Sequence, residues 1–373
     1  MNAAIETLEP VLKVDESREF RAHQAFLRAA RSHMEGPLLG ALAARYERTL
    51  AAREQAGEPI PTTAAEAMPL LDDCLEFQLY SWFFRHLQRF KYHRAGLGIV
   101  PTVRAQRARL EAQLESAARD AGAELRLNPD LPIPDYFRMV DFHQHTGGVA
   151  TDPLDGIVYE VARRTTVPQH SDPDAIYRLV FAQLPADRTW RRVLDWGTGH
   201  GAGLITWQAM HPESECHGVD LSGPCLKLAH KRARERGFRL YFSQQDLEHL
   251  DFADGKFDLV FFNFMLHELP PARLPALLRE ACRVLAPGGL FAGAEFHLRP
   301  GDPFQNVIQM SHAWLNNETY AMPWYSTPID VIAREAGFSR IEITPFERLI
   351  RSIPRSDGRM HPGTHWNLYL FGK

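Results

Sequence analysis

Residues 193–203 read Val193-Leu194-Asp195-Trp196-Gly197-Thr198-Gly199-His200-Gly201-Ala202-Gly203, and this segment is the best starting point for understanding the chain. An apolar run ends in a carboxylate, glycines alternate from position 197 to 203, and an apolar segment follows at 204–210. This order predicts a strand, a tight turn and a helix start, where backbone can approach a ligand closely. The acid at the strand end favours a ligand that carries an ammonium group over one that carries a pyrophosphate.

Beyond this turn, apolar runs alternate with helix-like segments. The runs that we expect to form strands are 193–195, 216–220, 240–244, 257–262, 289–295, 341–344 and 366–371. The helix-like segments between most of them are 203–210, 225–236, 274–284 and 329–336. Strands that alternate with helices predict a mainly parallel sheet covered on both faces.

Before the turn, the sequence is rich in helix-forming residues. We expect helices over 17–52, 75–90 and 101–121, with a break at 55–63 that contains Gly and two prolines. The organisation that follows is a helical N-terminal domain, 1–170, and an α/β domain, 171–373, with an insertion rich in aromatic residues and Asn at 297–326.

Composition narrows the class of protein. The chain has 373 residues, of which 45% are hydrophobic and 24% charged, as in an ordinary globular protein. A net charge of -4 argues against a dedicated nucleic-acid binder. Four scattered cysteines without a C-x-x-C pair favour neither a disulfide framework nor a structural zinc site. Neither a signal peptide nor a membrane span is evident, so we expect a cytoplasmic protein with no membrane partner.

Polar residues at the next strand ends extend the pattern. Asp220 ends the second expected strand, 23 residues after Gly197, where a carboxylate accepts both ribose hydroxyls of a nucleotide cofactor. Dehydrogenases and methyltransferases both use this device, and the turn also fits G-x-G-x-x-A, so a nicotinamide enzyme is an alternative. Asp246 follows the third strand and Asn263 the fourth.

With these residues in order, segment 190–295 resembles the core of a class I S-adenosylmethionine-dependent methyltransferase. The resemblance implies a doubly wound, mainly parallel seven-stranded α/β sheet (Rossmann-like) whose last strand is antiparallel. It covers most of the C-terminal half, while the N-terminal half resembles no family that its motifs identify.

The resemblance also implies a seat for S-adenosylmethionine. The methionine part would lie against Asp195 and the backbone near Gly197 and Gly199, with Asn263 close by. The remaining residues of the expected cofactor site are Asp220 for the ribose, Asp246 for the adenine end, Leu247 packed on the base, and Thr198 and Leu221 beside them.

His267 and Glu268, after the fourth strand, are the expected catalytic residues. A hydroxyl acceptor must lose a proton near neutral pH, and His is the side chain best suited to accept it. Many O-methyltransferases that this chain resembles carry a His followed by an acid. The alternative is that His267 only packs or caps the helix that follows.

The acceptor pocket is less defined by the sequence. In a strand, His143 and His145 would share one face and could hold a metal, but no third ligand is evident, so we expect a polar patch that closes over the site and no metal. The other residues expected to line the acceptor are Tyr136, Tyr159, His297, Trp314 and Tyr325.

We therefore expect a methyltransferase that acts on O or N of a small molecule, in secondary metabolism, with a homodimer through the N-terminal helices. Two alternatives keep the same fold. One is an enzyme that uses S-adenosylmethionine for cyclisation or aminocarboxypropyl transfer, and the other is a non-catalytic binding protein.

Overall fold

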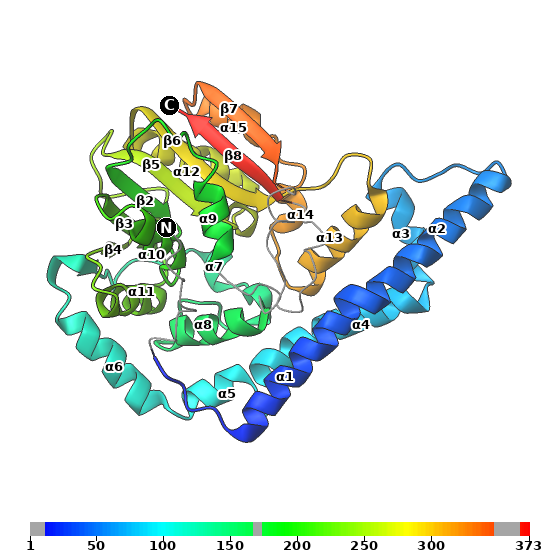
Figure 1. The fold of residues 1–373 in the computed structure, drawn as a ribbon, viewed down its shortest axis with the longest axis horizontal. Coiled ribbons are helices and arrows are strands. Elements are labelled where there is room, and N and C mark those ends of the chain that lie inside the picture. The colour runs from blue at the N-terminus through cyan, green and yellow to red at the C-terminus, as the bar shows by residue number, and fades with distance from the viewer. Residues whose placement is uncertain (1–11, 167–173, 347–365) are drawn as a thin grey trace.

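An eight-stranded sheet organises the molecule (Figure 1). The computed structural model describes residues 12–166, 174–346 and 366–373. The strands lie in the order β1-β4-β3-β2-β5-β6-β8-β7. The strand β8 is antiparallel to both of its neighbours, and the other pairs are parallel. The predicted doubly wound sheet with an antiparallel last strand is confirmed.

The described strands are β1 (Leu125–Arg126), β2 (Arg192–Trp196), β3 (Glu215–Asp220), β4 (Tyr241–Gln244), β5 (Phe257–Asn263), β6 (Leu285–Phe296), β7 (Arg340–Pro345) and β8 (Trp366–Gly372). The helices and helical turns of the first 181 residues are α1 (Arg18–His33), η1 (Met34–Leu38), α2 (Leu39–Gln55), α3 (Ala64–Asp72), α4 (Leu75–His93), α5 (Ile99–Arg104), α6 (Arg107–Arg119), η2 (Gly122–Glu124), α7 (Asp135–Arg138), η3 (Phe142–Gln144), α8 (Asp155–Thr166) and α9 (Ala175–Phe181). Those that follow are α10 (Ala202–Met210), α11 (Gly223–Glu235), η4 (Leu266–Glu268), η5 (Pro271–Arg273), α12 (Leu274–Val284), α13 (Pro303–Leu315), α14 (Ala321–Trp324) and α15 (Ile329–Glu335).

All seven predicted strands are present, and one more was missed. The additional strand is β1, two residues from the N-terminal half that pair with Phe242 and Ser243 at the edge of the sheet. A two-residue strand gives no alternation for a sequence pattern to detect, so the expected count of seven was one too low.

Side chains of the central strands alternate between two cores. Val193 and Leu259 join a cluster with α9, α10 and α11 on one face of the sheet. Leu194 and Val260 join a second cluster with α12, α14 and α15 on the other face. Because successive side chains of a strand point to opposite faces, a strand buried on both sides reads as a continuous apolar run.

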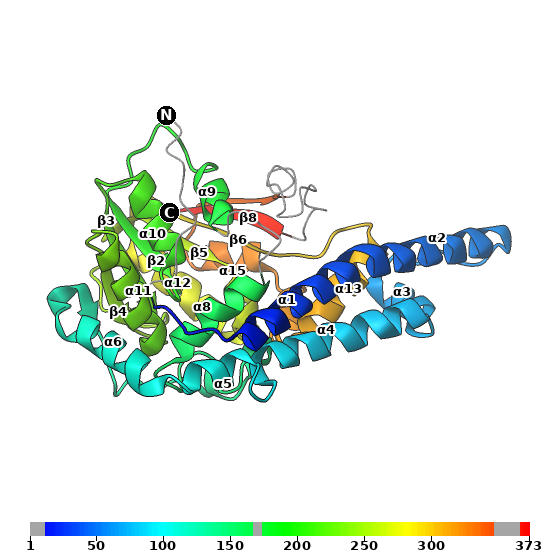
Figure 2. The ribbon, with the colours of Figure 1, turned by 60° about the horizontal axis from the view of Figure 1, so that its bottom comes forward.

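The first helices form an arm that projects from the α/β domain (Figures 1 and 2). The arm consists of α1, η1, α2, α3 and α4, and its own core contains Leu42, Tyr46, Leu71, Tyr80 and Phe84. Ser17 caps α1, and Thr63 with Glu66 forms a capping box at the start of α3. The described residues include no helix with the length and apolar character needed to cross a bilayer.

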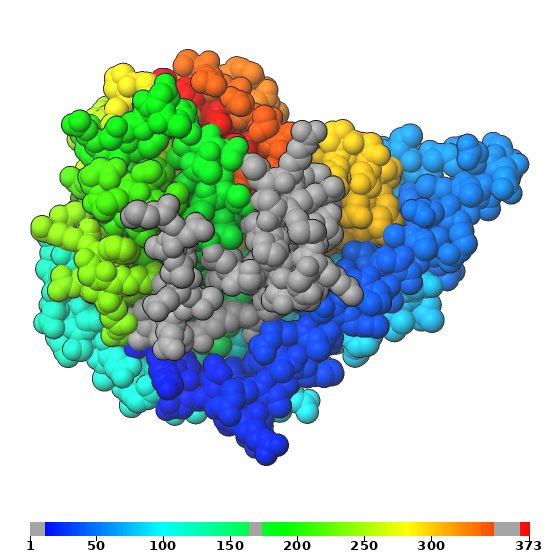
Figure 3. All heavy atoms as spheres, in the orientation of Figure 1, coloured from blue at the N-terminus to red at the C-terminus, as the bar shows by residue number. Residues whose placement is uncertain are grey.

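The insertion at 297–326 attaches this arm to the sheet. It forms α13 and α14, and α13 packs against α3 and α4. Phe304, Val307 and Ile308 of α13 complete the core of the arm. In Figure 3 the yellow and orange surface of this part of the chain lies between the arm and the α/β domain. The insertion therefore packs against the arm and also borders the carboxyl ends of the strands.

Candidate active site

Three glycines with positive φ build the turn after β2. Gly197, Gly199 and Gly201 have φ of 78°, 53° and 78°. Only glycine adopts this conformation without strain. At Gly201, which caps α10, a Cβ atom would also stand 2.8 Å from Cβ of Ala229. The backbone of the turn therefore packs closely against α11. The other side of the turn faces the carboxyl ends of the strands.

Two carboxylates flank the turn because β2 and β3 are paired. Asp195 is 4% exposed, and its Oδ2 accepts a hydrogen bond of 2.7 Å from Oγ1 of Thr198. Burial raises the pKa of Asp195 to about 7. Asp220 accepts hydrogen bonds from the backbone N–H groups of Gly199, at 2.7 Å, and Ser222, at 2.8 Å. Burial raises the pKa of Asp220 as well. A cationic group between these acids would relieve the cost of burying them.

At the end of β4, Asp246 lies at the surface of the second core. Its Oδ1 accepts a hydrogen bond of 3.0 Å from the backbone N–H of Glu248, and Leu247 is buried in that core. The helix α7 brings Tyr136 to the same strand end, and burial together with Asp246 and Glu248 raises the pKa of Tyr136 to about 12. Tyr136, expected beside the acceptor, is thus placed next to the residue expected at the adenine end.

Asn263, the last residue of β5, has a side-chain amide that the described part of the protein does not satisfy. Both polar atoms of its side chain are buried without a hydrogen-bond partner among the described residues. Leaving such groups unsatisfied costs about 1–3 kcal/mol each. Together with the two acids and the open turn, this amide fits the ammonium, carboxylate and hydroxyl groups of S-adenosylmethionine.

His267 is held by a carboxylate that the sequence reasoning missed. The residue is 1% exposed, and its Nδ1 lies 2.7 Å from Oε1 of Glu295, at the end of β6. Its backbone N–H donates to Oε2 of the same carboxylate at 3.2 Å. Its Nε2 is buried and has no hydrogen-bond partner in the described part of the chain. Burial opposes a charged ring, but the attraction and hydrogen bond of Glu295 outweigh it and raise the pKa of His267 to about 9.

Glu268 contacts the N-terminal half instead. Its Oε1 lies 2.9 Å from Nε2 of His143 in η3, and Nδ1 of His143 lies 3.3 Å from Oε1 of Glu318. Burial opposes the charge on His143, but the hydrogen bonds to the two glutamates raise its pKa to about 10. Nδ2 of Asn316 lies 2.7 Å from Nδ1 of His143 and donates to Oε1 of Glu318, while its Oδ1 accepts a 2.7 Å hydrogen bond from Gln88 of α4. A buried polar network therefore connects the arm to the loop that carries His267.

His143 and His145 do not share one face, as they would in a strand. Residues 142–144 form a helical turn, in which His143 has φ 56° and Gln144 φ 62°, instead of a strand. His145 is 2% exposed and stacks on Tyr92, with centroids 5.2 Å apart. Its Nε2 faces Asp155 at 3.5 Å. Among the described residues, no group of three or more His, Cys, Asp or Glu side chains could hold a metal ion.

The other predicted acceptor residues are spread over several elements. The ring of Tyr159, on α8, lies 4.0 Å from where a Cβ on Gly199 would stand. Tyr325 accepts a hydrogen bond of 2.8 Å from Gln309. His297 is half-buried directly after β6, and Trp314 is 74% exposed on α13. The structure thus brings Tyr159 to the turn and leaves Trp314 on the surface.

One signal in the sequence could have found Glu295. Glu295 ends an apolar strand in the same way as Asp195 does, so the rule applied to one strand end applies to the other. Glu318 and Asn316 lie within the aromatic insertion, but their contact with His143 spans more than 170 positions and depends on the packing of α13.

Comparison with known proteins identifies the class. Residues 193–289 match the family described as "Methyltransferase domain". The chain is 33% identical over 137 residues to a demethylmenaquinone methyltransferase of Thermus thermophilus, covering 37% of this chain and 61% of that protein. It is 34% identical over 163 residues to an uncharacterised methyltransferase of Synechocystis sp., covering 43% and 74%. A phthiotriol/phenolphthiotriol dimycocerosates methyltransferase of Mycobacterium leprae is 38% identical over 113 residues, covering 30% and 39%.

This chain therefore belongs to the methyltransferases, whose cofactor is S-adenosylmethionine, so the predicted family, enzyme class and cofactor are confirmed. A solved structure of Haemonchus contortus phosphoethanolamine N-methyltransferase 2 with S-adenosylmethionine has a TM-score of 0.47 and 18% identity, covering 66% of this chain and 61% of that one. The chain spans 39–74% of the three relatives described above, and the matched family segment leaves the helical arm outside.

Proposed function

We propose that this chain transfers a methyl group from S-adenosylmethionine to a hydroxyl or amine of a small molecule. The observation that carries the proposal is His267, a buried imidazole whose Nδ1 is held by Glu295 while its Nε2 has no hydrogen-bond partner among the described residues. A histidine fixed in this way is prepared to accept a proton through its second nitrogen.

In this proposal the turn and the strand ends bind the cofactor, which supplies an electrophilic methyl group on its sulfonium. Asp195 and Asn263 receive the ammonium and carboxylate of the methionine part, and Asp220 receives the ribose hydroxyls. Asp246 and Leu247 hold the adenine, with Tyr136 beside them. Apart from Tyr136, which lies in α7, these residues come from the ends of adjacent strands, so the packing of the sheet fixes their spacing.

The acceptor loses its proton to Nε2 of neutral His267. Glu295 then stabilises the imidazolium that forms and keeps the ring in one orientation, because its carboxylate stays hydrogen-bonded to Nδ1. The charge on His143 holds Glu268 away from this ring. Most of the remaining rate enhancement comes from placing the acceptor oxygen or nitrogen in line with the methyl group.

A second candidate is methylation of a carbon. The relatives include proteins named demethylmenaquinone methyltransferase and ubiquinone/menaquinone biosynthesis C-methyltransferase. Removing a phenolic proton makes the neighbouring ring carbon nucleophilic, so the same His267 would serve this reaction. The four free cysteines are buried, which favours a reducing cytoplasm as the setting for either reaction.

The test uses the full chain with methyl-labelled S-adenosylmethionine and an extract of small metabolites. We expect products one methyl group heavier, and NMR of the labelled methyl distinguishes O, N and C attachment. His267→Ala should bind the cofactor in calorimetry and form less product. Products that appear without an acceptor would instead indicate cyclisation of the cofactor. Acceptor products heavier by an aminocarboxypropyl group, without the labelled methyl, would indicate transfer of that group, and cofactor binding without any turnover would support a binding protein.

A further inference from the structure

The outer face of α4 carries an apolar stripe that the rest of the described chain does not cover. Its members, with their exposed fractions, are Leu75 (61%), Leu79 (38%), Trp82 (53%), Phe83 (37%) and Phe90 (37%). They recur at helical spacing and so share one side of the helix. The Trp82 ring contacts Phe83 and His86, with centroids 5.1 and 4.4 Å apart. A contiguous exposed stripe of this kind marks an interaction surface.

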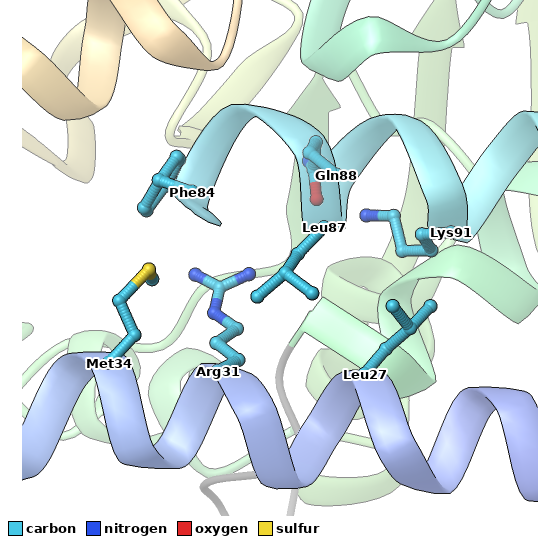
Figure 4. A pocket seen from close by; sticks show the side chains of 7 residues that line it. All are labelled: Leu27, Arg31, Met34, Phe84, Leu87, Gln88 and Lys91. Atoms are coloured by element: carbon cyan, nitrogen blue, oxygen red, sulfur yellow. The ribbon is translucent and has the colours of Figure 1, made fainter. Parts of the chain in front are cut away.

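The inner face of the same helix is occupied, so the stripe cannot turn inward. Figure 4 shows α1 and α4 side by side, with Arg31 pointing between Phe84 and Leu87, and Leu27 pointing toward Leu87 and Lys91. The guanidinium of Arg31 lies 5.6 Å from the centre of the Phe84 ring. This packing fixes the rotation of α4 about its axis and presents the stripe to the outside.

The order of residues along the stripe is nearly the same when it is read backwards. From a midpoint between Trp82 and Phe83, Leu79 corresponds to His86 and Leu75 to Phe90. A second α4 that crosses the first in the antiparallel direction would therefore place aromatic side chains against each other at the centre. On either side of the centre, each leucine would face an aromatic or imidazole ring of the other helix. This is the pattern of an isologous interface, in which residue i contacts j and j contacts i.

Charges follow the same symmetry. Glu76 corresponds to Arg89 about the midpoint. Exposed acids, Asp72 and Asp73, precede the helix, and exposed basic residues, His93 and Arg94, end it. An antiparallel pair places the acidic end of each helix against the basic end of the other, whereas a parallel pair places like charges together. Glu76 already pairs with Arg45 at 3.1 Å and remains partly exposed.

We propose that the occupant of this stripe is a second copy of the same chain, in a two-fold dimer in which the two α4 helices cross antiparallel at Trp82 and Phe83. The arm projects away from the α/β domain, and α4 runs along its lower border in Figure 2. The dimer therefore forms without covering the turn at Gly197–Gly201 and is independent of the reaction proposed above.

The oligomeric state is measured by light scattering after size exclusion, over a range of concentrations. We expect a dimer for the wild type and at least a tenfold weaker dimer for Trp82→Glu, which buries a charge at the crossing point. The matched control is Trp314→Glu, another exposed tryptophan, which should leave the dimer intact. Circular dichroism checks that both variants fold.

Cross-linking gives the direction of the helices. Leu75 and Phe90 are about 22 Å apart along the helix at 1.5 Å per residue. Oxidation of a mixture of Leu75→Cys and Phe90→Cys chains should therefore yield the mixed disulfide in excess over either symmetric one. All four native cysteines are buried, so the wild type provides a low background.

Three outcomes overturn the proposal. They are a wild type that stays monomeric at all concentrations, a dimer that Trp82→Glu does not weaken, and a Leu75→Cys chain that cross-links mainly to itself. Sedimentation with anionic lipid vesicles adds a further one, since a monomer that binds vesicles through Trp82 would assign the stripe to a membrane surface instead.

Discussion

At the scale of single residues, the pairing of His267 with Glu295 sets the pH range of the reaction. The pKa of His267 is raised to about 9, so at neutral pH most rings carry a proton and cannot accept another. We expect kcat at saturating cofactor to rise as pH increases toward 9, by about tenfold per unit below that value for a single ionisation.

The control for this rise is Glu295→Gln, which keeps the size of the side chain and removes its charge. Losing the carboxylate lowers the pKa of His267, so the inflection should move to lower pH, and kcat on its plateau should fall. An inflection that stays in place in this variant would show that another group limits the rate.

Asp195 makes a separate pH prediction for cofactor affinity. Burial raises its pKa to about 7, so its charge is lost as pH falls through that value. Because an ammonium group binds the ionised form better, the affinity for S-adenosylmethionine should weaken as pH decreases from 8 to 6. Calorimetry of wild type and Asp195→Asn tests this, since the variant should bind more weakly and with little dependence on pH over the same interval.

These residues also show which parts of the site could be predicted from the sequence. Asp195, Asp220, Asp246 and Asn263 were predicted from their positions at strand ends, because parallel strands bring their carboxyl ends to one edge. The partner of His267 was missed, although Glu295 also ends a strand. Whether Glu268 or Glu295 contacts the ring of His267 depends on the direction of each side chain. The side chain of Glu268 turns toward His143 instead.

At the scale of elements, the start of α10 should tolerate no side chain at Gly201. Its φ is 78°, and a Cβ there would stand 2.8 Å from that of Ala229. Gly201→Ala would combine the strain of a left-handed backbone with a clash between the turn and α11. We therefore expect a loss of about 3 kcal/mol in the free energy of unfolding. Weaker binding of S-adenosylmethionine should accompany it.

Gly237 offers a matched control, since its φ is 71° and nothing lies within 4 Å of a Cβ built there. Gly237→Ala should cost about 1 kcal/mol from strain alone and leave cofactor binding unchanged. Denaturant unfolding of the two variants separates the clash from the strain. Equal losses in both would contradict the importance of close packing between the turn and α11.

Elements with a strong period were predicted well, and those without one were not. The strands from β2 to β8 and the helices between them follow apolar runs and helical spacing. The helical turn at 142–144 was not predicted, because a single turn with left-handed residues at His143 and Gln144 has no apolar period that a sequence would show.

At the scale of the whole molecule, the arm and the site are joined through Gln88. Its amide donates a 2.7 Å hydrogen bond to Asn316, which in turn contacts His143. Gln88→Leu keeps the size of the side chain and leaves a buried amide without this partner, so we expect a loss of about 1–3 kcal/mol in stability. The KM for the acceptor should rise, while calorimetric binding of the cofactor should stay the same.

A matched change for this test is Gln78→Leu on the same helix, whose exposed side chain donates a hydrogen bond to the backbone carbonyl of Asp72 at the end of α3. It should change neither quantity by a measurable amount. If both variants behave alike, the network between arm and site has no influence on acceptor binding.

Because α13 completes the core of the arm, the order of synthesis has a consequence for the newborn chain. Phe84 leaves the ribosome 220 residues before Phe304, its partner in the same core. At the usual speed of translation, the first helices wait roughly 10–40 s with part of their core open to water. During that interval the nascent arm presents an apolar surface of the kind that chaperones bind. A chain that ends before residue 303 lacks α13, so this surface stays exposed permanently.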